Sequence, residues 1–346
     1  MNVKESAASI PHFGNAWGYV VGVQSPVTKS QQAAVPSGGP PPEPPPPVGP
    51  APRRSSGRAW EWTLAAVLLL PNLILLIVFT YRPLIDNVRL SFTDWNISSP
   101  TLNSVGFANY VEWFGRDDTK VVLKNTLIFT VATVGISLAV GLGLALLLDQ
   151  QLRGRNLVRS MIFAPFVISG AAIGVAFQFV FDPSFGLVRD LLARVGMDSP
   201  DFYQQSGWAL FMVTVTYIWK NLGYTFVIYL AALQGRRADL DEAAEIDGAS
   251  AWTRFRRVLM PQLRPTTFFL SITVLLSSVQ VFDIINVMTR GGPVGNGTTT
   301  LVYQVYQETF VNQRAGYGAT IATVMFLILL VVTVVQVRVM DKGRQS

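Results

Sequence analysis

Two ionisable side chains lie inside long apolar stretches of this 346-residue sequence, and they are the first candidates for chemistry. Lys220 stands within an apolar run over residues 208–233, and Asp283 lies near the end of another over 265–285. A charge in a bilayer is costly unless it reaches the interface, pairs with an opposite charge or faces water. The position of Lys220 therefore predicts one of two roles. Either it forms an ion pair with a carboxylate of this chain or of a partner, or it attracts an anionic solute.

Other reactive groups are few. The sequence has no cysteine and a single histidine, His12, which lies far from any apolar run. Disulfide and thiol chemistry are thereby excluded, and histidine-based metal or acid–base chemistry in a membrane is disfavoured. No Gly-x-x-x-x-Gly-Lys-[Ser/Thr] loop occurs, so this chain lacks that means of holding nucleotide phosphates. No nucleophile–base pair or metal-ligand cluster stands out, so we expect no catalytic residue, no metal site and no cofactor in this chain.

The elements that position these residues are membrane spans. Half of the residues are hydrophobic and only 14% are charged, whereas soluble domains carry about 25% charged residues. Six stretches reach the roughly 20 residues that a helix needs to cross a bilayer core. They cover residues 62–81, 125–148, 160–181, 208–233, 265–285 and 315–337. The sequence therefore predicts an all-α integral membrane protein with six transmembrane helices.

The basic residues predict the orientation of these spans. If the N-terminal segment is cytoplasmic, the inner segments hold fifteen lysines and arginines from residue 53 onward and the outer loops hold nine. Inner loops carry the excess of Lys and Arg in membrane proteins, so both termini are expected in the cytoplasm. The same placement accounts for the net charge of +6 without a nucleic-acid partner. The sequence therefore predicts a multi-pass membrane protein.

The most informative polar segment joins the fourth and fifth spans and reads DEAAEIDGASAWTRFRRVLMP over residues 241–261. Apolar and small residues recur there at helical spacing, which indicates an amphipathic helix on the inner membrane face. Gly248 marks the point where a bend is least costly. Taken alone, the pattern also fits a simple interfacial helix.

This segment resembles the EAA motif of binding-protein-dependent ATP-binding-cassette (ABC) permeases. The motif reads Glu-Ala-Ala, then Asp-Gly-Ala, then Leu-x-Pro, and the sequence has Val258 and Met260 where isoleucine and leucine are expected. The resemblance implies a coupling helix that seats in a cleft of an ATP-binding subunit. Small residues permit close docking, and the glutamate offers a carboxylate to a basic partner. The implied coupling residues are Glu242, Ala243, Ala244, Asp247, Gly248 and Pro261.

A second stretch, over residues 282–293 with Thr298–Leu301 after it, resembles the outer end of the fifth helix in carbohydrate-importer permeases. Together the resemblances cover about residues 62–340. They imply a type I ABC importer (MetI-like) transmembrane domain, located in a bacterial inner membrane, rather than an enzyme. The implied partners are a second permease, two ATP-binding subunits that hold ATP and Mg²⁺, an extracytoplasmic solute-binding protein and a small-molecule solute.

The resemblance also divides the chain into three parts. Residues 1–59 hold 12 of the 21 prolines and are expected to form a disordered cytoplasmic tail. That tail is read either as a partner-binding arm or as a dispensable leader. Residues 60–120 hold the first transmembrane helix and an extracytoplasmic loop. Residues 121–340 form the permease core, with the cytoplasmic coupling loop over about 236–264.

Across the helices, the chain resembles the A-type permease of glycerol-3-phosphate importers, as in Trp219-Lys220 and Ala231-Ala232-Leu233-Gln234. That likeness implies a sugar or polyol derivative as solute, such as glycerol 3-phosphate or a related phosphodiester. The rival hypothesis is an ion-coupled secondary transporter. Such transporters place acids or histidines within the membrane, and only Asp283 meets that description here.

In related permeases the solute lies near mid-membrane among the third, fourth and fifth spans. The positions carried over by this resemblance are Phe166, Gly170, Trp219, Lys220, Leu222, Gly223, Phe226, Ser277, Ser278 and Val281. Aromatic faces, hydroxyls and glycines suit a polyol. The same residue types suit plain helix packing in a membrane, and the partner permease is an alternative holder of the solute. These alternatives stay open at the level of sequence.

Overall fold

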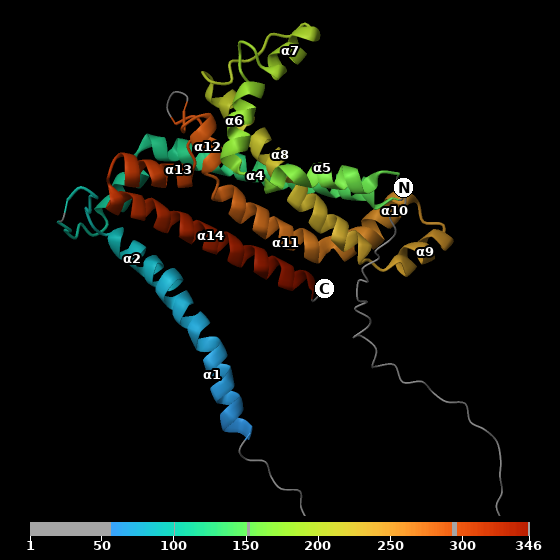
Figure 1. Cartoon of the computed structure of the whole chain (residues 1–346), viewed down its shortest axis with the longest axis horizontal. Helices are drawn as coiled ribbons and strands as arrows, with labels where there is room; N and C mark the ends of the chain where they lie inside the picture. The colour runs from blue at the N-terminus through green and yellow to red at the C-terminus, as the bar shows by residue number, and fades with distance from the viewer. Residues whose placement is uncertain (1–56, 100, 151–152, 293–295, 345–346) are drawn as a thin grey trace, which may run out of the picture. The chain divides into compact units, whose positions relative to one another are not determined.

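The computed structural model describes residues 57–99, 101–150, 153–292 and 296–344, and these fold almost wholly into helices (Figure 1). The only β pairing in those ranges is an isolated bridge between Thr93 and Ser104, so the all-α prediction is confirmed for them. The proline-rich tail predicted over residues 1–59 lies outside the described residues as far as residue 56.

The helices follow one another along the chain. In chain order they are α1 Gly57–Leu76, the π-helical turn η1 Ile77–Tyr81, α2 Arg82–Leu90, α3 Ala108–Gly115, α4 Asp117–Asp149, α5 Arg155–Val167, α6 Gly170–Val180, α7 Leu187–Arg194, α8 Ser206–Gln234, α9 Ala238–Ile246, α10 Ala251–Arg254, the π-helical turn η2 Phe255–Leu259, α11 Met260–Val279, α12 Asp283–Met288, α13 Leu301–Tyr306, the π-helical turn η3 Gln307–Val311 and α14 Ala315–Arg344.

Four helical stretches in the described residues are long and apolar enough to cross a membrane, namely Trp62–Leu90, Asp117–Asp149, Ala251–Met288 and Ala315–Met340. The bent pair α5–α6 raises the number to five. At 1.5 Å per residue, α8 is about 43 Å long, which exceeds the roughly 30 Å of a bilayer core. It is absent from these stretches, and Lys220 and Asn221 lower its hydropathy. The predicted count of six spans is therefore not confirmed.

The third predicted span is broken, so the expectation of one continuous helix over residues 160–181 is wrong. α5 ends at Val167, Ile168 and Ser169 are extended, and α6 leaves at 103° to α5. The Ser169 hydroxyl accepts a hydrogen bond from the Ala172 backbone N–H at 3.3 Å, which caps α6. Apolar content gave no sign of the break because the apolar run continues through Ile168 and Ser169 without a charged residue.

The helices α4, α8 and α11 lie side by side and form the centre of the described core (Figure 1). At the crossing of α4 and α8, a Cβ on Gly141 would lie 2.5 Å from Thr225 Oγ1, and that hydroxyl donates to the Ser137 carbonyl at 3.1 Å. A small residue at a crossing allows two backbones to approach closely. The buried side chains around it include Ala145, Phe226, Tyr229, Leu263 and Leu270.

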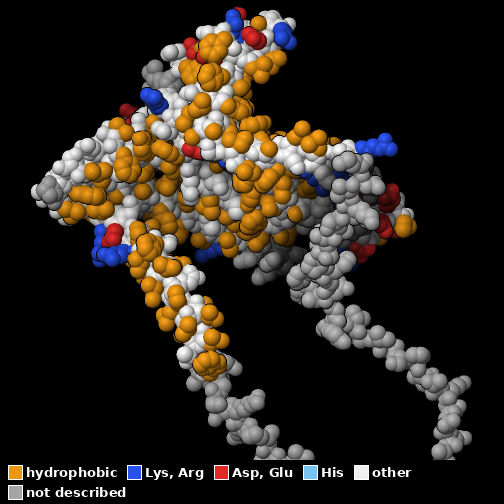
Figure 2. All heavy atoms as spheres, viewed as in Figure 1, with side chains coloured by type: hydrophobic (Ala, Val, Ile, Leu, Met, Phe, Trp, Pro, Cys, Tyr) orange, Lys and Arg blue, Asp and Glu red, His pale blue; other side chains and the backbone are white. Residues whose placement is uncertain are grey.

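The span formed by α1 and α2 buries none of its most apolar window within the chain. Figure 2 shows hydrophobic side chains exposed along much of α1. Near the C-terminal end of this span, Asn87 Nδ2 of α2 donates to Thr323 Oγ1 of α14 at 3.1 Å. A helix that is apolar on all sides needs lipid or another protein around it.

Candidate functional sites: the coupling loop and a cavity among the helices

The loop between α8 and α11 is a helix–turn–helix. Gly248 has φ +77°, a conformation that glycine adopts without steric cost. The Ala249 N–H donates to the Ala244 carbonyl at 2.9 Å, which closes the C-terminus of α9. The Ser250 hydroxyl then accepts from the Thr253 N–H at 3.3 Å and caps α10. The amphipathic segment is therefore two short helices with a bend at Gly248.

The outer surface of this loop carries most of the residues predicted to couple. Glu242, Ala243, Asp247, Gly248 and Pro261 are exposed, and Ala244 is half-buried. Two large apolar side chains stand beside them: Ile246 is 87% exposed and Trp252 is 67% exposed. Apolar side chains exposed next to a carboxylate are typical of a docking surface for another protein.

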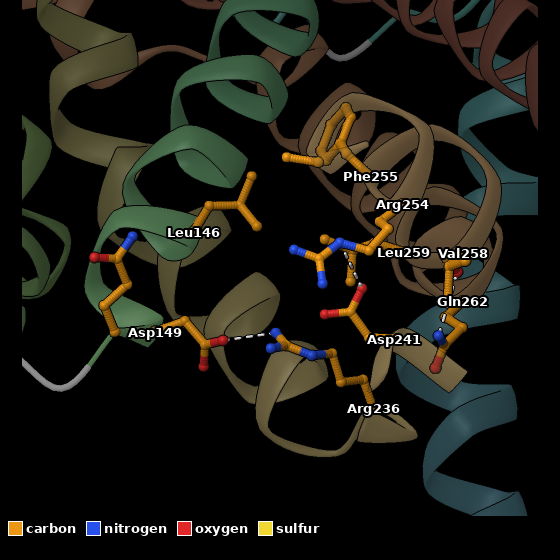
Figure 3. Close-up of a pocket in the computed structure, with 11 residues that line it drawn as sticks. Leu146, Asp149, Arg236, Asp241, Arg254, Phe255, Val258, Leu259 and Gln262 are labelled. Atoms are coloured by element: carbon orange, nitrogen blue, oxygen red, sulfur yellow. Dashed lines mark hydrogen bonds and ion pairs between the residues drawn. The ribbon is translucent and has the colours of Figure 1, made fainter. Parts of the chain in front are cut away.

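Behind the loop lies a cavity of about 230 Å³ between the end of α4 and the start of α11 (Figure 3). On one side, Arg236 Nη1 lies 2.6 Å from Asp149 Oδ2, the last residue of α4. On the other side, Arg254 pairs with Glu245 and its Nε lies 3.9 Å from Asp241 Oδ1. Figure 3 shows the side chains of Arg236, Asp241 and Arg254 directed toward the same space.

A neighbouring ion pair has a different environment. Arg237 Nη2 lies 2.9 Å from Asp239 Oδ2, and both side chains are well exposed. The hydrogen bond from Arg237 lowers the pKa of Asp239 below its ordinary value. Water screens such a pair, so it contributes little to stability.

A second cavity, of about 200 Å³, lies among α5, α8 and α11. Phe166 and Ser277, two of the predicted pathway residues, line it. The other residues that line it are Tyr217, Asn221, Tyr224, Thr273 and Val274. Sequence reasoning missed these five residues. A helical projection would have found most of them, because 217, 221 and 224 share one helix face and 273 and 277 share another.

Lys220 stands next to this cavity. Its Nζ lies 5.5 Å from the centre of the Phe166 ring, and that ring stacks on Tyr224 at 5.4 Å. Within the described part of the chain, no carboxylate oxygen lies within 4 Å of Lys220 Nζ. An ion pair within this chain is therefore not formed with any described residue, and of the first predicted role the pairing with a carboxylate of a partner subunit stays a prediction.

The other seven predicted pathway residues lie outside this cavity. Five of them occupy helix contacts or tight turns: Gly170 against Asp283, Gly223 against the α5 backbone, Phe226 in the buried core, Ser278 with its hydroxyl donating to Leu275, and Val281 in a second buried cluster. Trp219 packs on Phe177 of α6 at 5.0 Å. The Leu222 carbonyl accepts from Thr225 at 2.9 Å.

The described residues combine several apolar helices of membrane-crossing length, a cavity among helices and an exposed helix–turn–helix, which are features of a membrane transport component. The model of the family described as binding-protein-dependent transport system inner membrane component matches residues 137–345. The chain therefore belongs to this family of ABC transporter permeases. As a permease it is the membrane part of a transport system and is not the catalytic subunit.

Relatives and solved structures agree with this assignment. The chain is 36% identical over 270 residues to a probable ABC transporter permease protein of Pyrococcus horikoshii, covering 76% of this chain and 91% of the relative. It is 33% identical over 287 residues to the sn-glycerol-3-phosphate transport system permease protein UgpA of Yersinia pseudotuberculosis, covering 83% and 97%. A chain of a bacterial ABC transporter involved in the import of the acidic polysaccharide alginate matches with TM-score 0.69 and 25% identity, over 82% of this chain and 98% of that chain.

Proposed function

We propose that this chain is a permease subunit of an ATP-driven importer for a negatively charged sugar or polyol derivative, such as glycerol 3-phosphate or a related phosphodiester. The observation that carries this choice is Lys220, a cation beside an internal cavity with no described carboxylate within 4 Å. An unpaired lysine in a membrane helix is retained at a cost, which an anionic solute would offset. Relatives named for sn-glycerol 3-phosphate and for acidic alginate support an anion.

The cavity suits a small hydroxylated solute. The Phe166 and Tyr224 rings offer faces for C–H groups, while the hydroxyls of Tyr224 and Thr273 and the amide of Asn221 offer hydrogen bonds. Its volume of about 200 Å³ is below the roughly 300–1,000 Å³ of typical small-molecule sites. The site in this subunit therefore holds a small solute or one end of a larger one, and a second permease supplies the remaining wall.

Energy comes from two ATP-binding subunits, which hold the ATP and Mg²⁺. The exposed surface of α9 and α10, with Glu242, Ala243 and Ile246, docks in a cleft of one of them. Closure of those subunits on ATP moves the loop and switches the pathway between outward and inward access. An extracytoplasmic solute-binding protein delivers the solute to the outer loops, and both termini of the chain lie in the cytoplasm.

The test is uptake by the assembled transporter in proteoliposomes. The complex should import radiolabelled sn-glycerol 3-phosphate only when ATP is present on the side of the membrane that carries the ATP-binding subunits. Ionophores that collapse proton and sodium gradients should not stop this uptake. Uptake that needs an ion gradient and no ATP would show a secondary transporter instead.

Lys220 provides the test of solute class. A hydrogen bond to a charged group is worth about 1.5–3 kcal/mol, so Lys220→Met should raise the KM for an anionic solute by about tenfold or more. Lys120→Met is the matched control, because Lys120 is an exposed lysine paired with Asp117. An unchanged KM in a well-assembled Lys220→Met transporter would remove the support for an anionic solute at this cavity.

A further inference from the structure

We propose that Asp149 and Arg236 form an ionic clasp that makes α4 follow the coupling loop, so that movement of the loop reaches the cavity among α5, α8 and α11. This inference rests on the proposed ATP-driven function. Asp149 and Arg236 are positioning residues, since neither lines the cavity between α5, α8 and α11 nor lies on the surface offered to the ATP-binding subunit.

The clasp joins two segments at the points where each leaves its helix. Asp149 is the last residue of α4, and Arg236 follows the end of α8 by two residues. The distance between Arg236 Nη1 and Asp149 Oδ2 is 2.6 Å (Figure 3). The side chains are only 27% and 20% exposed, so salt and water screen this pair less than a surface pair.

Among the described residues, Asp149–Arg236 is the one ion pair that joins α4 to the coupling loop. Apolar side chains pack there as well, since Ala145 and Leu148 of α4 lie in a buried cluster with Leu233 of α8 and Leu263 of α11. The cavity of about 230 Å³ lies between the last turn of α4 and part of η2. The carbonyl of Leu148 accepts a hydrogen bond from Arg159 Nη2 at 2.8 Å, but Arg159 belongs to α5. The π-helical turn η2 beside the cavity is a distortion that is frequent at functional sites.

From the clasp, α4 leads directly to the cavity among the helices. Gly141 and Ser137 lie about 12 Å and 18 Å along α4 from Asp149, at 1.5 Å per residue. Both contact Thr225 of α8, which follows the cavity residue Tyr224 in sequence. Because a Cβ on Gly141 would lie 2.5 Å from Thr225 Oγ1, the two helices are in close contact at this point. A shift of the cytoplasmic end of α4 therefore displaces the α8 face that lines the cavity.

The neighbouring pair of Arg237 and Asp239 provides a matched control. Its nitrogen–oxygen distance of 2.9 Å is similar, and Arg237 directly follows Arg236 in the sequence. Its side chains, however, are 70% and 63% exposed, and both residues belong to the loop region. Breaking it removes a charge pair of the same chemical type without affecting α4.

The experiment compares Asp149→Asn, Arg236→Gln and Arg237→Gln in the assembled transporter. The measurement is solute imported per ATP hydrolysed, with assembly checked by co-purification of the ATP-binding subunits. Asp149→Asn and Arg236→Gln should lower this ratio by about fivefold or more, the lower end of coupling between protein sites. Arg237→Gln should match wild type. The exchange Asp149→Arg with Arg236→Asp should restore much of the ratio, since it reverses the pair without removing it.

A distance measurement separates the clasp from the transport function. The chain has no cysteine, so spin labels can be placed on Leu147→Cys of α4 and Arg256→Cys of η2, both exposed in this chain. The distance distribution should broaden with Arg236→Gln and stay narrow with Arg237→Gln. A wild-type import-to-ATP ratio in Arg236→Gln, or an unchanged distribution, would overturn the clasp. If the distance distribution broadens with Arg236→Gln as expected, but the wild-type transporter shows no ATP-driven uptake, the proposed function is overturned and the clasp is not.

Discussion

A single methyl group at Gly223 should separate α5 from α8. A Cβ on Gly223 would lie 2.6 Å from the Ile162 carbonyl oxygen and 2.8 Å from Phe163 Cα, both backbone atoms of α5. Neither atom can rotate away, so the helices must part by about 0.8 Å to reach ordinary contact near 3.4 Å. Overpacking of this kind costs about 1–3 kcal/mol.

The helix propensity of alanine acts in the opposite direction. Replacing a helical glycine by alanine gains about 0.5–1 kcal/mol through lower conformational entropy in the unfolded chain. Gly143→Ala on α4 isolates this gain, because a Cβ there meets nothing within 4 Å. The difference in unfolding free energy between Gly223→Ala and Gly143→Ala is therefore the steric cost itself, about 1–3 kcal/mol.

Thermal unfolding of the purified protein in detergent, followed by intrinsic tryptophan fluorescence, measures that difference. For a chain of this size, Tm should differ by about 1–2 °C for each kcal/mol, with Gly223→Ala the lower. Gly135→Ala, also on α4 and also with open space around its Cβ, should behave like Gly143→Ala. Equal Tm values for Gly223→Ala and Gly143→Ala would refute the close approach of α5 and α8.

Three further predictions concern the coupling loop and the orientation. Glu242→Lys should leave membrane insertion intact but reduce co-purification of the ATP-binding subunits, because Glu242 is exposed on α9; full coupling in this variant would count against a docking role. Gly248→Ala should cost about 1–2 kcal/mol in the left-handed conformation, which faster hydrogen exchange in α9 would show. Gly248→Asn should be tolerated, since asparagine adopts φ near the +77° observed there. Equal exchange rates in the two variants would contradict a conformational role for Gly248. Alkaline-phosphatase fusions after Asp201 and Gln313 should be active and those after Arg153 and Arg254 inactive; the reverse pattern would place the coupling loop outside the cell.

The two arginine pairs at the start of the coupling loop show why sequence reasoning stops short of mechanism. Arg236 and Arg237 are adjacent and identical in type, and both have an aspartate partner. The partner of Arg237 lies two residues away, so local reasoning can find it. The partner of Arg236 is Asp149, 87 residues earlier, and only the packing of α4 on α8 brings the two together.

Local properties of the chain were readable from the sequence because they depend on neighbouring residues. Apolar runs located the four described helical stretches that are long enough to cross a membrane, and the motif around Glu242 indicated the family. The bend at Gly248 followed from glycine, the residue that takes a positive φ without cost. The length of the spans was less well predicted: the run predicted over 125–148 belongs to a helix that begins at Asp117, because polar first turns carry no apolar signal.

Tertiary structure decided which side chains meet. Phe166, Lys220 and Ser277 gather at one cavity, while Phe226 and Val281, chosen by the same resemblance, are buried in packed clusters. The break at Ser169 was equally hidden, since it depends on a cap within α6 and on Asp283 lying against Gly170. The helical period tells which residues share a face of a helix. Which of them faces a cavity, a neighbouring helix or lipid is set by the other helices that pack around it.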